Sequence, residues 1–207
     1  MTPTIPAANA LARLRDGNAR FVAGRSIADS AALARHALVD GQQPFAVILG
    51  CSDSRVPVEL VFDQGFGDLF VIRVAGNIVA PSLLGSIEFA ASRFGTRLVV
   101  VMGHTRCGAV TATVDELLGK GSAESRNLRS IVDRVRPAVE PLVSASGGDY
   151  DRLLGEAVRA NVRASVEQVR HGSTIIDGLI RDDGLRVVGA EYSLESGVVT
   201  FLDGSSE

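Results

Sequence analysis

The 207-residue chain has little of what builds several specialised classes of protein. Its two cysteines are too few for a disulfide framework. Its longest apolar runs cover five to seven residues, far fewer than the ~20 that a membrane span needs. The N-terminal ten residues lack the basic and apolar regions of a signal peptide. A net charge of −3 gives no basic surplus for nucleic acid. We therefore expect a cytoplasmic protein whose partner is a small molecule, with no membrane or nucleic-acid partner.

What the chain does contain is a set of apolar runs separated by helical patterns. The runs show no polar alternation, which is typical of strands covered on both faces of a parallel sheet. They lie at 45–49, 69–74 and 98–102, and two further β-rich stretches follow at 185–190 and 198–202, separated by a turn signal at 195–197. We expect the last two stretches to form a hairpin at one edge of the sheet.

Helical spacing of apolar residues fills the intervals between these runs. The expected helices cover 7–22, 82–94 with Ser82 as the capping residue, 108–118, 127–143, 151–170 and 173–181. Strands that alternate with helices form right-handed βαβ units. The predicted fold class is therefore α/β, with a mostly parallel central sheet and helices on both faces.

Three of the five cysteine and histidine residues follow the ends of predicted strands. Cys51 and His104 come directly after two apolar runs, and Cys107 lies three positions beyond His104. Functional groups gather at the carboxyl ends of parallel strands, and two thiolates with one imidazole make a tetrahedral zinc set with one open position. A cysteine that ends an apolar strand is also often a buried small hydrophobe, so this pattern alone leaves both interpretations open. We expect the other two histidines, His36 and His171, to be solvated.

An acid and a base stand two positions apart beside the first cysteine, as Asp53 and Arg55. In an extended segment their side chains point the same way. They could form a surface ion pair worth ~0–1 kcal/mol. Alternatively, the Arg55 guanidinium could fix the orientation of a carboxylate next to a metal.

Two separated sequence motifs together resemble those of a known protein family. Cys51-Ser-Asp-Ser-Arg55, with His104-Thr-Arg-Cys107-Gly108 starting 53 positions after Cys51, resembles the signature of β-class carbonic anhydrases. The resemblance is strong over residues 5–118, looser over the rest, and extends through the stretches 41–44, 67–73 and 86–90.

This resemblance implies reversible hydration of CO2 to bicarbonate and a proton. It implies one Zn2+ per chain held by Cys51, His104 and Cys107, with zinc-bound hydroxide as the nucleophile. Asp53 and Arg55 would form the catalytic dyad of the family. In some members that aspartate is itself a fourth zinc ligand in a closed resting state.

The resemblance also implies an assembly, either a homodimer or a dimer of dimers. Gln42 is similar to a glutamine that hydrogen-bonds substrate across a subunit boundary, and Gly108 to a glycine whose amide lies near the substrate. We expect residues 1–207 to form a single β-carbonic-anhydrase-like domain. Its α/β core would cover 45–207, and its N-terminal helical arm, within 1–35, would pack on the neighbouring subunit. A lone helix of ~15 residues needs such a surface, because it is marginally stable in water.

One departure from the family pattern concerns regulation by bicarbonate. The allosteric subclass has a tryptophan three positions before the first cysteine ligand; here that position is Ile48, and the chain contains no tryptophan. The arginine of that second site has a counterpart in Arg73, but its partner is missing. We therefore expect no bicarbonate allostery.

Two other functions remain open alternatives on the same residues. One is hydrolysis of a CO2-like sulfur compound, such as carbon disulfide or carbonyl sulfide. The other is a non-catalytic zinc or thiol sensor.

Overall fold

The protein is built around a five-stranded sheet, described here from a computed structural model that covers residues 5–27, 36, 38–145 and 147–202. The strand order is β2-β1-β3-β4-β5; β1 to β4 run parallel, and β5 pairs antiparallel with β4. The strands span Ala46–Gly50 (β1), Leu69–Arg73 (β2), Leu98–His104 (β3), Arg186–Tyr192 (β4) and Val199–Phe201 (β5). The two central strands, β1 and β3, are buried at every residue, because helices cover both faces of the sheet.

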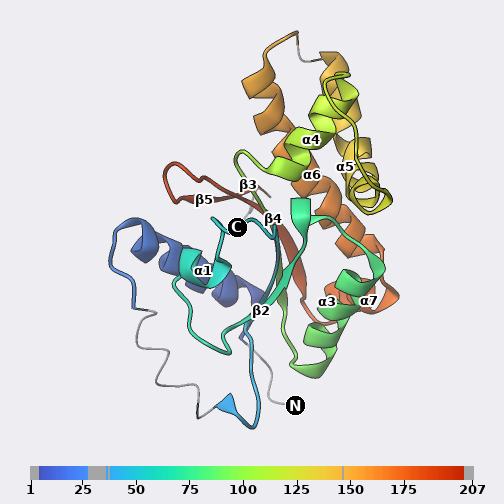
Figure 1. Ribbon diagram of the computed structural model, residues 1–207. Coiled ribbons are helices and arrows are strands. Elements are labelled where there is room, and N and C mark those ends of the chain that lie inside the picture. Colours follow the sequence, from blue (N-terminus) through green and yellow to red (C-terminus); the bar gives the residue numbers. More distant parts are fainter. Residues whose placement is uncertain (1–4, 28–35, 37, 146, 203–207) are drawn as a thin grey trace.

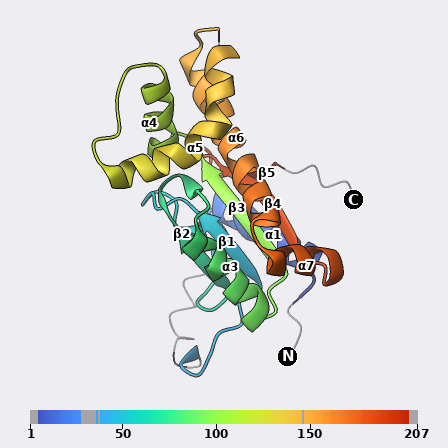
Figure 2. The same ribbon diagram turned by 90° about the vertical axis from the view of Figure 1, so that its right-hand side faces the viewer.

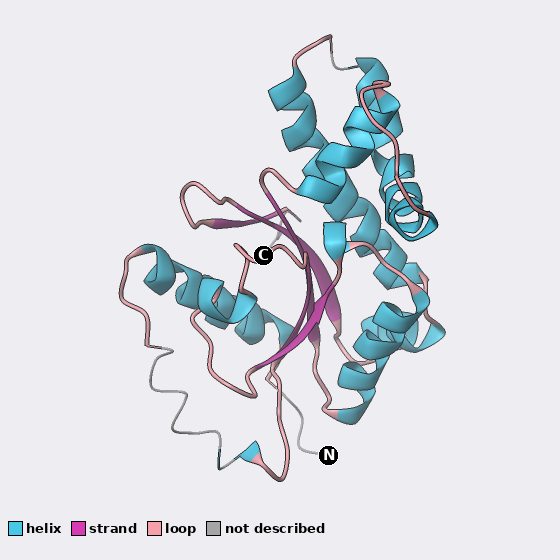
Figure 3. Ribbon diagram, in the orientation of Figure 1, coloured by secondary structure: helices cyan, strands magenta, loops and turns pink. Residues whose placement is uncertain are grey.

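The helices form two layers around this sheet, as Figures 1 and 3 show. On one face lie α1 (Ala7–Val22) and α2 (Val58–Val61); on the other lie α3 (Pro81–Arg93), α6 (Tyr150–His171) and α7 (Thr174–Asp182). Two more helices, α4 (Gly108–Leu117) and α5 (Arg126–Ala145), pack on each other and on α6 beyond the carboxyl end of β3 (Figure 2). The predicted α/β class, with a mostly parallel sheet and helices on both faces, is confirmed.

The predicted elements agree with the structure apart from a few boundaries. Ser82 was expected to cap the second long helix, but α3 begins one residue earlier, at Pro81, and Ser82 lies in its first turn. Proline suits the first helical position because its φ is already helical and its missing N–H would have no partner there. Strand β3 extends to His104, two residues beyond the predicted end at 102, because it pairs with β4 as far as Tyr192.

The N-terminal helix α1 lies on the sheet of its own chain. Leu14 is fully buried in the core shared with β1 and β3. The absence of a side chain at Gly17 allows a close approach to α2, because a Cβ there would lie 1.9 Å from the Phe62 carbonyl oxygen. Asn18 donates to the Val61 and Gly197 carbonyl oxygens. The apolar stripe of α1 is thus covered within the chain. Packing of this arm on a neighbouring subunit, through its remaining surface, stays a prediction.

Among the described residues, no helix is both long and apolar enough to cross a membrane.

Candidate metal centre

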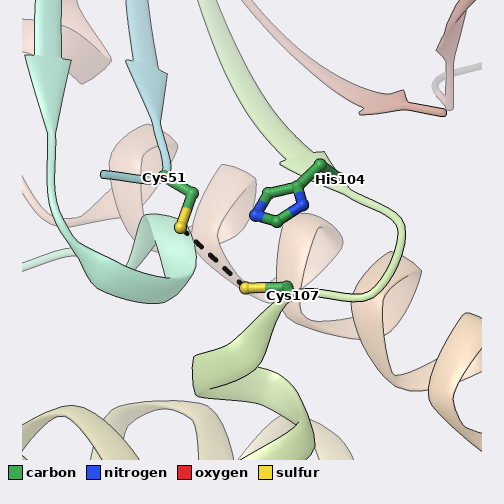
Figure 4. Close-up of side chains that lie close together, drawn as sticks. All are labelled: Cys51, His104 and Cys107. Atoms are coloured by element: carbon green, nitrogen blue, oxygen red, sulfur yellow. Dashed lines mark hydrogen bonds between the residues drawn. The ribbon is translucent and has the colours of Figure 1, made fainter. Parts of the chain in front are cut away.

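The two cysteines and His104 meet at the carboxyl edge of the sheet. Cys51 follows β1, His104 ends the adjacent strand β3, and Cys107 immediately precedes α4 (Figure 4). One sulfur or nitrogen atom from each residue lies within 4.8 Å of the other two. The convergence predicted from strand ends is confirmed, because β1 and β3 are parallel neighbours.

The spacing of the two sulfur atoms suits a tetrahedral metal. Cys51 Sγ and Cys107 Sγ are 3.9 Å apart. Zinc–sulfur bonds of ~2.3 Å in tetrahedral geometry place two sulfurs about 3.8 Å apart. All three side chains are buried, with 5%, 0% and 1% exposure for Cys51, His104 and Cys107. These residues therefore fit a zinc ion.

The imidazole of His104 is oriented for metal binding. Its Nδ1 lies 2.9 Å from the Thr105 carbonyl oxygen, and because that oxygen can only accept, Nδ1 carries the proton. Its Nε2 is buried and has no hydrogen-bond partner within the described part of the chain. A buried polar atom left unpaired costs about 1–3 kcal/mol. A metal bound at Nε2 would use that lone pair.

The contact between the two thiols shifts their pKa values in opposite directions. The contact with Cys107, aided by His104 and by the Gly76 amide, lowers the pKa of Cys51, although burial opposes the change. The same contact, together with burial, raises the pKa of Cys107. A divalent cation between the sulfurs would favour the thiolate form of both, since thiolates are the metal-binding species.

The Asp53 carboxylate is held by a two-pronged hydrogen bond from Arg55. Arg55 Nε donates to Oδ1 at 2.9 Å and Nη2 donates to Oδ2 at 2.6 Å, while the Arg55 backbone N–H also donates to Oδ1 at 2.9 Å. The Arg55 guanidinium holds the pKa of Asp53 well below its usual range, so the carboxylate stays ionised. Asp53 Oδ2 lies 3.8 Å from His104 Nε2, beside the Cys–His–Cys group. The arrangement is the paired one, in which the carboxylate faces Arg55.

Three hydrogen bonds from two residues hold the Cys51 loop, and the sequence did not predict them. Arg73 Nε donates to the Cys51 carbonyl oxygen at 2.9 Å, and its Nη2 donates to the Asp53 carbonyl oxygen at 2.6 Å. The Gly76 amide lies 3.3 Å from Cys51 Sγ. The Gly76-Asn77 pair that follows a strand is a turn signal, so a turn at this place could have been predicted, but its contact with Cys51 could not.

A pocket of about 600 Å3 opens beside the dyad. It is lined by Arg55, Thr105, Arg106, Asp151, Leu154, Gly155, Leu194 and Glu195. Gly108 is the first residue of α4, where a backbone N–H has no helical partner. A Cβ at Gly108 would meet no atom within 4 Å, so there is free space next to this residue.

Gln42 lies at the opposite edge of the sheet. It precedes β1 and lines a separate pocket with Phe66 and Phe94, whereas Cys51 follows the carboxyl end of β1. A strand of five residues spans roughly 16 Å. Within one chain, the structure therefore does not bring Gln42 to the metal centre.

Comparison with known proteins gives a consistent result. Residues 46–199 match the profile of the family described as "Carbonic anhydrase". The chain is 42% identical over 187 residues to a carbonic anhydrase of Mycolicibacterium smegmatis, covering 90% of this chain and 88% of that protein. It is 39% identical over 191 residues to carbonic anhydrase 2 of Mycobacterium tuberculosis, covering 92% and 90%. A solved β-carbonic anhydrase of Aspergillus fumigatus superposes with a TM-score of 0.76 at 25% identity, covering 97% of this chain and 92% of that one.

The fold is of the α/β class, and its buried Cys–His–Cys cluster has the ligand types of a metal-binding protein. The profile match and these similarities show that the chain belongs to the β-class carbonic anhydrase family. The sensor and the sulfur-compound hydrolase that the sequence left open are not favoured, since the matching proteins are carbonic anhydrases.

Proposed function

We propose that this chain catalyses the reversible hydration of CO2 with one zinc ion held by Cys51, His104 and Cys107. The observation that carries the proposal is the buried His104 Nε2, which has no hydrogen-bond partner in the described chain and lies beside two buried sulfurs. Zinc held by these three residues would supply a Lewis acid that lowers the pKa of a bound water molecule.

In the proposed reaction, the Asp53–Arg55 dyad acts through the position and the negative charge of the Asp53 carboxylate. Because Arg55 keeps the Asp53 carboxylate ionised, that carboxylate can only accept hydrogen bonds. From its place 3.8 Å from His104 Nε2, it would accept a hydrogen bond from an O–H group beside the Cys–His–Cys cluster and so orient that group. The Gly108 amide, at the start of α4, would donate to a substrate oxygen; the free space beside this residue supports that role.

The pH dependence of hydration tests the proposed function. Two thiolates cancel the charge of the dication, and Asp53 adds a further negative charge, so bound water should be less acidic than the ~7 of a three-histidine site. Arg55 opposes this effect by neutralising Asp53. We expect the stopped-flow hydration rate of the zinc-loaded protein to rise steeply above neutral pH. A flat rate between about pH 6 and 9 would contradict the proposed charge balance.

Loss of the dyad should impair turnover without releasing zinc. We expect Arg55→Ala and Asp53→Ala each to lower the hydration rate about a hundredfold, because each removes the fixed charge that orients the reacting O–H group. The matched control is Arg106→Ala, which removes a neighbouring guanidinium that is 77% exposed and pairs only with Glu195 in the described chain. Zinc content, measured on every variant, should stay at one per chain; its loss from either dyad variant would make the pair structural.

We also propose that the working unit is a homodimer, in which Gln42 serves the metal centre of the other subunit. Gln42 is at least one strand length from the metal centre of its own chain, so a role at the substrate requires a second copy. The surface around it is apolar: Phe66 is 62% exposed and Val39 is 78% exposed. Apolar area of this kind is typical of a surface that packs against another subunit.

We expect that bicarbonate does not regulate this chain at a second site. Ile48 is fully buried in the core under α1, and the chain has no tryptophan. The guanidinium of Arg73 donates to the Cys51 and Asp53 carbonyl oxygens, so it is engaged in holding the metal loop. Bicarbonate should therefore inhibit hydration as a simple product, without a sigmoidal dependence on its concentration.

A further inference from the structure

The short turn after β2 contacts a sulfur of the metal centre. This turn, Ala75–Asn77, places the Gly76 amide 3.3 Å from Cys51 Sγ, as a hydrogen-bond donor. Such a bond draws negative charge from a thiolate and fixes its direction, and partners of this kind influence how a metal ligand binds. The position of the Gly76 amide is therefore part of the metal centre.

The backbone of this turn has an unusual conformation. Gly76 has a φ of 72° and Asn77 a φ of 44°, so two consecutive residues lie in the left-handed region. Glycine adopts that region freely, and asparagine adopts it more readily than most residues that have a side chain. A Cβ on Gly76 would also lie only 3.0 Å from Ala109 Cβ. A conformation of this kind persists when surrounding contacts hold it.

The contact that holds the turn comes from α6, 85 positions further along the chain. Asn161 Nδ2 donates to the Gly76 carbonyl oxygen at 2.8 Å. Asn161 is 2% exposed, and its neighbours on the buried face of α6 include Val158 and Val162. A polar side chain on such an apolar face is stable only when it is hydrogen-bonded. The side chain of Asn161 thus links α6 to the turn beside Cys51.

We propose that Asn161 is a positioning residue of the metal centre. By holding the Gly76 carbonyl, it sets the turn so that the Gly76 N–H faces the Cys51 sulfur, while Asn161 itself contacts neither metal nor substrate. Without this hydrogen bond the turn relaxes, the N–H···S bond is lost, and Cys51 becomes a less preorganised ligand. The inference rests on the proposed metal site.

The test uses the full-length protein loaded with ¹¹³Cd in place of zinc and observed by NMR. In the wild type, the Gly76 amide proton should show scalar coupling to ¹¹³Cd through the N–H···S bond, alongside coupling from the Cys51 and Cys107 β-protons. In Asn161→Leu, which keeps the volume but removes the donor, the Gly76 coupling should disappear while the cysteine couplings remain. Chelator competition should show zinc affinity about tenfold weaker.

The matched control is Val166→Ala, on the same buried face of α6. It removes packing but not the hydrogen bond, so it should retain the Gly76 coupling and wild-type zinc affinity. Should Asn161→Leu not fold, Asn161→Ser provides a shorter polar side chain that cannot reach the turn, and the same loss is expected. The proposal is overturned if the wild type lacks the Gly76 coupling, or if the Asn161 variants match the control. Absence of the cysteine couplings would instead overturn the metal site itself.

Discussion

Replacing His104 by alanine is expected to remove zinc from the protein and to lower CO2 hydration by about a thousandfold or more. The imidazole supplies the one neutral ligand of the buried cluster, and two sulfurs 3.9 Å apart cannot alone complete a tetrahedral site. The substitution removes the hydrogen bond from Nδ1 to the Thr105 carbonyl oxygen, worth about 1 kcal/mol, but Nε2 has no hydrogen-bond partner among the described residues to lose. The fold should therefore survive the loss of activity.

The measurements are zinc per chain, circular dichroism and stopped-flow hydration on the same preparations. A matched control is His171→Ala: this imidazole is 71% exposed at the end of α6 and pairs with Glu167 at 3.3 Å. The control should keep both zinc and activity. Treatment of the wild type with a chelator should reproduce the His104→Ala result, and re-addition of zinc should restore the rate. A His104→Ala protein that stays active with zinc bound would refute the assigned ligand set.

Much of this metal centre could be predicted because it depends on sheet geometry. Continuous apolar runs identify strands covered on both faces, and parallel strands bring their carboxyl ends to one edge. Cys51 and His104 follow two such runs, and Cys107 is only three residues further along. Asp53 and Arg55 lie close to Cys51 in sequence, so they could form either a surface ion pair or a carboxylate oriented by Arg55 beside a metal. The structure contains the ion pair and brings its carboxylate to 3.8 Å from His104 Nε2.

The contacts that support the centre could not be predicted, because they join distant parts of the chain. Arg73 is 22 positions from Cys51, and Asn161 is 85 positions from Gly76. Asn161 occupies a helical position where spacing alone suggests an apolar residue. Contacts of this kind depend on how α6 crosses the sheet, which hydrophobic periodicity does not specify.

Mixing two inactive variants should restore activity if Gln42 serves the partner's metal centre. Gln42→Ala keeps all three ligands but lacks the glutamine, and His104→Ala keeps the glutamine but lacks a ligand. In a hybrid dimer, the Gln42→Ala subunit binds zinc and receives Gln42 from its partner, so one site is complete. With two equivalent sites in a symmetric dimer, the purified hybrid should show about half of the wild-type hydration rate.

The separation of Gln42 from the metal centre of its own chain predicts which outcome the hybrid will give. Gln42 precedes β1 and Cys51 follows it, so one subunit cannot bring both to a single substrate without unfolding the central strand. If Gln42 nevertheless acted within its own chain, the hybrid would contain no complete site and would be no more active than Gln42→Ala alone. The parent homodimers, assayed beside the hybrid, provide the baseline. Because Gln43 is adjacent in sequence, Gln43→Ala is the matched control and should retain the wild-type rate without any partner. Recovery in the hybrid alone would establish that each metal centre is completed by two chains.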